Sequence, residues 1–116
     1  MKRIESIKQN YEFRRIYAKG KSAARPHMAV YTMKNRRGKS RIGITVSTKV
    51  GNAVVRNRIR RRLREIYRLN TQVLQPGTDI IIVARGKSKS ATYAQLQAEY
   101  LRLIDKLGCT AKDEKP

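Results

Sequence analysis

The sequence predicts an α+β fold, an α/β sandwich in which about four strands form one sheet and the helices pack mainly on one face. Segments with helical periodicity alternate with segments of strand character, in the order helix, strands, helix, strand, helix. The 116 residues suit one domain, and no internal repeat or long linker divides them. We therefore expect residues 1–116 to form a single domain, with a frayed tail at 109–116.

The first helix is expected to begin at Asn10, a possible N-terminal cap, and to end before Gly20. Phe13, Ile16 and Tyr17 lie three and four residues apart, so they form one stripe on this helix. The stripe predicts a face that packs on the rest of the domain.

Two strands are expected next, at residues 28–34 and 41–47. In the second, apolar side chains alternate with Arg41, Gly43, Thr45 and Ser47. Residues 35–39 between them include a glycine and three basic residues, which predicts an exposed hairpin loop.

The central helix is expected at 51–69, with Asn52 as a possible cap, and a buried strand follows at 79–85. The strands at 41–47 and 79–85 flank this helix, so they should be parallel. After a basic loop at 86–90, the last helix should open with the capping-box pair Thr92 and Gln95 and close at Gly108.

Arginines dominate the central helix. On a helical wheel its apolar residues form a narrow sector that can pack on a sheet, comprising Val55, Ile59, Leu63 and Ile66 with Tyr67 beside it. The opposite sector holds Asn57, Arg60, Arg61, Arg64 and Arg68, and the flanks hold Arg56, Arg58 and Arg62. Guanidinium groups make paired hydrogen bonds to phosphate, and a merely solvated helix face normally mixes both charge signs. We therefore interpret this arginine comb as a phosphate-binding surface.

The overall charge favours the same interpretation. The chain has 28 Lys and Arg residues against 8 Asp and Glu, a formal net charge of +20. Such a surplus needs an external polyanion, with nucleic acid ahead of an anionic membrane. Membrane insertion is disfavoured because the apolar sector is needed for the core. RNA is favoured over DNA because the sequence lacks a helix-turn-helix pair, a zinc site and a dimerising zipper.

The aromatic residues Phe13, Tyr17 and Tyr31 form a possible second site. Partly exposed aromatics can stack on unpaired bases. Their spacing alone, however, favours packing in the core, so both interpretations remain open at this point.

No catalytic constellation is evident. His27 is the only histidine, and the carboxylates are scattered apart from Asp113 and Glu114 near the end. Cys109 is the only cysteine, which excludes an internal disulfide and fits a reducing compartment, so we expect a cytoplasmic protein.

Residues 42–61 read IGITVSTKVGNAVVRNRIRR and resemble the signature of the bacterial ribonuclease P protein subunit. The Arg56-Asn57-Arg58 element is the part by which that family is named. The likeness extends over about residues 7–107, with Phe13, Tyr17, Tyr31, the strand at 79–85 and the final helix in the family's order.

The resemblance implies a bacterial, cytoplasmic protein that partners ribonuclease P RNA and promotes removal of the 5′ leader from precursor tRNA. The RNA would perform the chemistry with magnesium that it mainly binds itself, and neither a small-molecule substrate nor a membrane is implied. The resemblance assigns contacts with the catalytic RNA to Arg56, Asn57, Arg58, Arg60, Arg61 and Arg64 of the arginine comb. We expect Arg62 and Arg68 of the same helix to bind this RNA as well. It assigns the leader to a groove lined by Phe13, Tyr17, Tyr31, Ser47 and Lys49. It also implies a left-handed crossover between the parallel strands, against the general rule.

The sequence departs from the family pattern at Thr48, where many relatives carry a second lysine, and at Tyr17, where many carry phenylalanine. Tyrosine still stacks, so the groove is expected to keep its function. The main alternative is a structural ribosomal or ribosome-assembly RNA-binding protein. An autonomous nuclease and a DNA-compacting protein are further alternatives.

Overall fold

The computed structural model describes residues 4–111. The elements are α1 (Asn10–Lys19), β1 (Lys21–Ala24), β2 (Met28–Lys34), β3 (Arg41–Val46), α2 (Ala53–Leu69), β4 (Thr78–Ala84) and α3 (Tyr93–Lys106). Short 3-10 helices lie at Thr71–Val73 and Gly86–Ser90. The predicted order of helices and strands is confirmed, with boundaries that shift by one or two residues at most elements. For example, Ser47 and Arg85 lie just beyond the ends of their strands.

The four strands form one sheet in the order β1-β2-β4-β3. β3 and β4 are parallel, as predicted from the helix between them, and the other neighbours are antiparallel. The hairpin predicted for residues 35–39 is wrong, because β4 lies between β2 and β3. Ile80, Ile81 and Ile82 explain the insertion, since their side chains are fully buried and a strand apolar on both faces belongs inside a sheet.

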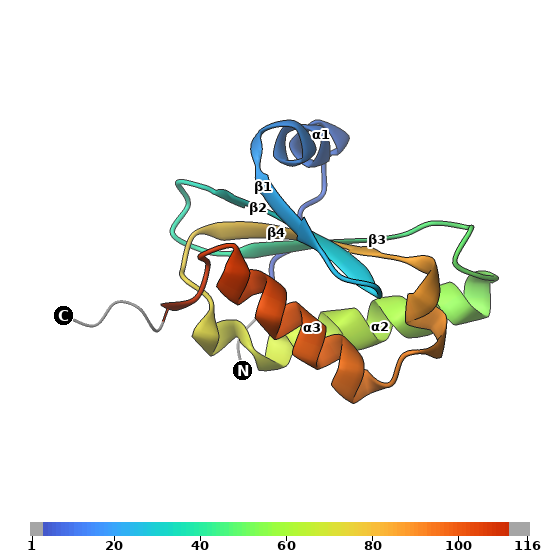
Figure 1. The fold of residues 1–116 in the computed structure, drawn as a ribbon. Coiled ribbons are helices and arrows are strands. Elements are labelled where there is room, and N and C mark those ends of the chain that lie inside the picture. The colour runs from blue at the N-terminus through green and yellow to red at the C-terminus, as the bar shows by residue number, and fades with distance from the viewer. Residues whose placement is uncertain (1–3, 112–116) are drawn as a thin grey trace.

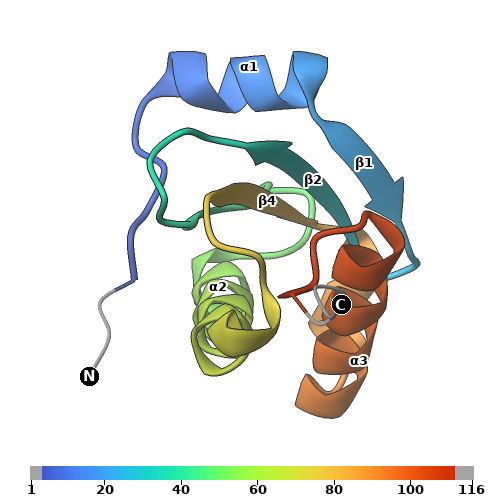
Figure 2. The ribbon, with the colours of Figure 1, turned by 90° about the vertical axis from the view of Figure 1, so that its left-hand side faces the viewer.

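The two faces of the sheet are covered unequally. Figures 1 and 2 show α2 and α3 together on one face and α1 alone on the other. Ile59, Leu63 and Ile66 of α2 and Leu96 and Tyr100 of α3 are buried in the main core beneath the sheet. The predicted packing of helices mainly on one face is therefore confirmed.

A smaller apolar cluster holds α1 on the opposite face. Its buried members are Ile7, Ile16 and Ile81, and Phe13 and Tyr31 pack against them while only partly buried. α1 thus covers part of its face and leaves the remainder accessible.

Side-chain caps define the helix ends. Asn52 Oδ1 accepts a hydrogen bond from the Val55 amide, and Thr92 and Gln95 form the predicted capping box. The cap of α1 is Gln9 rather than the predicted Asn10, because Glu12, three residues after Gln9, completes a capping box there. The sequence offered two adjacent polar candidates, and only the structure distinguishes them.

Two peripheral features differ from expectation. β1 was not predicted: its four residues are mostly exposed, so it has no apolar alternation to reveal it. The tail expected to fray from 109 is ordered at its start, where Cys109 and Thr110 are buried and Thr110 pairs with Leu74. The Gln75 amide also donates to the Cys109 carbonyl at 2.8 Å. Residues 112–116 of the predicted tail lie outside the described residues.

Candidate nucleic-acid interface

The arginine comb lies on the side of α2 that faces away from the core. Ile59, Leu63, Ile66 and Tyr67 are buried, as the helical wheel predicts. Asn57, Arg61, Arg64 and Arg68 are exposed, whereas the flanking Arg56, Arg58 and Arg62 and the central Arg60 are half-buried. Packing of the apolar sector on the sheet therefore fixes the direction in which the guanidinium groups point.

Few acidic side chains neutralise these arginines. Within residues 4–111, Arg68 is the only comb residue with an ion pair, to Glu65 at 2.7 Å. The hydrogen bond from Arg68 lowers the pKa of the Glu65 carboxyl below its usual value. The Nε atom of Arg58 is buried and has no hydrogen-bond partner among the described atoms. The comb is thus a surface of positive charge with unused donors.

Other members of the comb are positioned by neutral acceptors. Arg56 Nε donates to the Gly51 carbonyl at 3.1 Å, and Arg60 donates to Asn57 Oδ1 at 3.1 Å. Arg62 donates to the Ala91 carbonyl at 3.3 Å. These bonds restrict the side chains without neutralising them, so their charge remains available to a polyanion.

Three aromatic residues meet on the opposite face of the sheet. The Tyr17 and Tyr31 rings are in edge-to-face contact with centroids 4.8 Å apart, and the Phe13 and Tyr17 centroids are 6.4 Å apart. Tyr17 is 38% exposed, while Phe13 and Tyr31 are half-buried. The aromatics therefore pack on the small core and at the same time present ring surface to solvent.

Two residues of β3 complete this site, and the sequence analysis did not predict a role for either. The Tyr17 hydroxyl and Thr45 Oγ1 are 3.2 Å apart and share a hydrogen bond. A Cβ atom at Gly43 would lie 2.8 Å from the Phe13 ring, so glycine allows α1 to approach the sheet closely. The alternation within 41–47 could have revealed both, because it places them on the face away from the main core.

Ser47 and Lys49 are exposed in the turn that follows β3. The Lys49 amide donates to Ser47 Oγ at 3.3 Å, and the Val50 amide donates to the Ser47 carbonyl at 3.1 Å. Ser47 continues the alternation of Gly43 and Thr45, so it extends the same face beyond the strand. We call the surface of Phe13, Tyr17, Tyr31, Thr45, Ser47 and Lys49 the aromatic groove, after the groove that the family resemblance implies. The turn at its end leads directly into α2, which connects the groove to the comb.

A buried ionic network lies beside the groove. Arg41 donates to both oxygens of Asp79, and its Nη1 donates to Glu12 Oε2 at 2.9 Å. The hydrogen bond from Arg41 is the main cause that lowers the pKa of Glu12, and the hydrogen bond to Asp79 is the main cause that raises the pKa of Arg41. Glu12 and Phe13 are neighbours in α1. The bond from Arg41 to Glu12 therefore helps to hold α1, and with it the Phe13 ring, over the sheet.

The described residues offer no group of three or more His, Cys, Asp and Glu side chains that could hold a metal ion. Glu12 and Asp79 approach each other, but Arg41 lies between them and uses their oxygens. These carboxylates therefore do not fit a magnesium ion, which the resemblance assigns mainly to the RNA. No helix in the described range is long and apolar enough to cross a membrane.

A helix whose arginines, apart from Arg68, have no ion pair among the described residues lies on one side of the sheet, and accessible aromatics lie on the other; together they define an RNA-binding protein. The model of the Ribonuclease P family matches residues 1–108. The chain is 43% identical to the ribonuclease P protein component of Clostridium novyi over 93% of this chain and 97% of that protein. It is also 43% identical to the protein component of a Thermoanaerobacter species, over 98% of both chains.

Solved structures agree with these sequence comparisons. The Staphylococcus aureus RNase P protein has a TM-score of 0.81 and 38% identity, over 90% of this chain and 95% of that one. The Thermotoga maritima RNase P protein has a TM-score of 0.80 and 31% identity, over 88% of this chain and 96% of that one. The chain belongs to the bacterial ribonuclease P protein family, which confirms the resemblance seen in the sequence. Membership implies RNA binding, tRNA processing and a ribonuclease P RNA as partner.

Proposed function

We propose that this protein binds ribonuclease P RNA through the arginine comb and holds the 5′ leader of precursor tRNA in the aromatic groove. The catalytic RNA cleaves the leader and binds the magnesium that this requires. The protein acts by position and charge, and it supplies no catalytic side chain. Family membership supports the general role, and the geometry of the two surfaces supports the assignment of each RNA to its surface.

The observation that carries the proposal is the scarcity of ion pairs along the comb, where Glu65 is the only carboxylate in α2. Of the seven arginines in α2, only Arg68 is in an ion pair within the described residues. Closely spaced positive charges repel one another in the free protein, and this repulsion is relieved when phosphates approach. A rigid, highly phosphorylated partner such as a folded RNA fits this surface.

The aromatic groove suits a single strand. Stacking on rings such as Tyr17 requires bases that are not paired, and it tolerates any base because each has a flat face. Lys49, exposed at the end of the groove, can pair with a backbone phosphate. Because the 5′ leader is the part of a precursor tRNA outside its folded body, it is the segment that this groove would hold.

The groove and the comb are also adjacent along the chain. The turn at Ser47–Val50 ends one surface, and α2 begins the other at Ala53. A protein that grips the catalytic RNA by α2 thereby presents the groove at a fixed position relative to it. Such positioning lowers the entropic cost of bringing the scissile bond to the catalytic RNA.

The test is a reconstitution at low magnesium with a bacterial ribonuclease P RNA and a labelled precursor tRNA. We expect the protein to promote cleavage at the mature 5′ end and to cleave nothing when the catalytic RNA is left out. Arg60→Ala/Arg61→Ala should lose most of this effect. The matched control Arg36→Ala/Arg102→Ala removes two exposed arginines outside α2 and should retain it.

Two outcomes would overturn the proposal. Cleavage by the protein without any RNA subunit would identify an autonomous nuclease. Binding of both RNAs with no change in cleavage rate would instead favour the alternative of a structural ribosomal or ribosome-assembly protein.

A further inference from the structure

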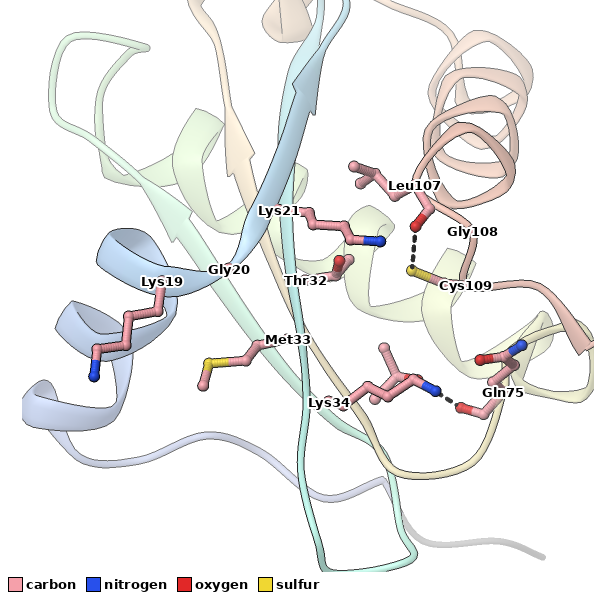
Figure 3. Close-up of a pocket in the computed structure, with 11 residues that line it drawn as sticks. Lys19, Gly20, Lys21, Thr32, Met33, Lys34, Gln75, Leu107, Gly108 and Cys109 are labelled. Atoms are coloured by element: carbon pink, nitrogen blue, oxygen red, sulfur yellow. Dashed lines mark hydrogen bonds between the residues drawn. The ribbon is translucent and has the colours of Figure 1, made fainter.

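A cavity of about 200 Å³ lies on the edge of the domain, outside both surfaces described above. Its walls come from the end of α1, the paired strands β1 and β2, and the turn after α3, and Figure 3 draws the lining residues. The comb on α2 packs beside β3, at the other edge of the sheet. The proposed function therefore does not use this cavity.

The cavity exists because α3 ends before it has covered the sheet. Lys21 pairs with Thr32 across β1 and β2, and Lys34 follows Thr32 by two residues, so all three belong to the face on which α3 packs. At Gly108, where φ is 75°, the chain turns away from α3. The hydrogen bond from the Gln75 amide to the Cys109 carbonyl fixes this turn, which forms one wall of the cavity.

Two lysines extend into this space. In Figure 3 Lys21 reaches across Thr32 toward Cys109, Lys34 reaches toward Gln75, and Lys19 points to the other side of the strands. None of the eleven lining residues is acidic, and neither Lys21 nor Lys34 is in an ion pair within residues 4–111. Burial raises the pKa of the Cys109 thiol, and the positive charges of Lys21 and Lys34 oppose that rise.

Charge balance within the fold does not explain this pair. Lys19, in the last turn of α1, offsets the negative end of that helix, but Lys21 and Lys34 lie on strands. The thiol and hydroxyl of Cys109 and Thr32 add small polar groups between them. Two ammonium groups without an acidic partner, beside a hollow that also contains a hydroxyl and a thiol, are the features expected of a site for a compact anion.

We propose that Lys21 and Lys34 form a phosphate-binding site for an RNA backbone segment that neither the comb nor the aromatic groove contacts. The inference rests on the proposed function in taking RNA as the source of the phosphate. The segment comes either from leader nucleotides beyond the groove or from the catalytic RNA. Both present the same phosphodiester, so experiment must separate them.

The first experiment needs no RNA and uses inorganic phosphate as the probe. In an NMR titration we expect saturable shifts of the Thr32 and Gly108 amides in the unmodified protein. Lys21→Ala/Lys34→Ala should abolish these shifts. The control Lys8→Ala/Lys106→Ala removes the same charge from exposed positions outside the cavity and should retain them. Shifts that persist in the first variant would overturn the site.

The second experiment measures affinity as a function of salt for the same two variants. Loss of one phosphate contact should reduce the slope of log K against log salt by about 0.7 to 0.9. A loss confined to precursors whose leader extends well past the groove assigns the site to the distal leader. A loss with the catalytic RNA alone assigns it to that RNA.

Equal slopes for the Lys21→Ala/Lys34→Ala variant and its control would overturn the RNA assignment. Failure of the proposed function has a different signature, because the unmodified protein would then not promote cleavage at all. The phosphate titration would be unaffected by that failure.

Discussion

Arg41 and Asp79 lie directly opposite each other on the parallel strands β3 and β4, and two hydrogen bonds of 3.0 and 2.7 Å join them. Their side chains leave the sheet on the face of α1, where the remaining Arg41 nitrogen reaches Glu12 at 2.9 Å. All three residues are at least nine-tenths buried. One guanidinium thus links the N-terminal ends of β3 and β4 to α1, the helix that carries Phe13 and Tyr17.

Removal of this guanidinium should destabilise the domain. Arg41→Met leaves the carboxylates of Glu12 and Asp79 buried without their main partner, which typically costs about 3–5 kcal/mol. Urea unfolding followed by circular dichroism measures the free energy of unfolding. Arg36→Met, at an exposed loop position, is the control and should change it little. Equal stability of the two variants would show that the network contributes nothing.

Glu12 should make stability depend on acidic pH. Arg41 lowers the pKa of folded Glu12 below its ordinary value of 4.5, so the carboxylate stabilises the fold fully above that value. The contribution should decline as pH falls below 4.5 toward the lower folded pKa. Glu12→Gln should flatten this part of the pH–stability curve relative to the unmodified protein. Parallel curves would contradict the role assigned to Glu12.

Binding to ribonuclease P RNA should weaken steeply with salt. With about 6 to 10 phosphate contacts, affinity should fall roughly 10³- to 10⁵-fold between about 50 and 200 mM salt, because each contact releases counterions. Filter binding at several salt concentrations measures the slope. Arg60→Ala/Arg61→Ala should make it shallower than Arg36→Ala/Arg102→Ala does. A flat response of the unmodified protein would be incompatible with a phosphate-binding comb.

Phe13→Ala should weaken binding of precursor tRNA more than binding of mature tRNA, because only the precursor has a leader to stack. We expect a loss of about 1–3 kcal/mol if one base stacks on this ring. Tyr17→Phe is the matched variant: it keeps the ring, removes the hydroxyl bonded to Thr45, and should retain leader affinity. If Phe13→Ala lowered the affinity for both RNAs equally, the role of this side chain would be purely structural.

Polyvalent anions should stabilise the free protein. Sulfate or phosphate screens the repulsion within the arginine comb and binds the folded state, and either effect raises the melting temperature. Differential scanning calorimetry with sulfate and with chloride at equal ionic strength separates binding from screening. An unchanged melting temperature in sulfate would argue against closely spaced guanidinium groups.

Local patterns in the sequence determined most of the secondary structure and one of the two proposed surfaces. Helical periodicity placed α2 with its buried and exposed sides correctly, because the same side chains that form the core also fix the outward direction of the arginines. The run at Ile80–Ile82 predicted a buried strand for a similar reason, since adjacent β-branched apolar residues suit a strand that is covered on both faces. The family signature then indicated which class of protein carries such a helix.

Only the tertiary structure decided how these elements meet. Strand order depends on contacts between residues distant in the sequence: the run Ile80–Ile82 marks β4 as an inner strand, but nothing local identifies β2 and β3 as its two neighbours. The same holds for Arg41, Glu12 and Asp79, which appear unrelated until the sheet and α1 bring them together. The exposure of Tyr17 and the closeness of Phe13 to Gly43 likewise depend on where α1 rests. Side-chain periodicity records which face of an element is buried, but the partner that buries it is fixed only when the whole chain packs.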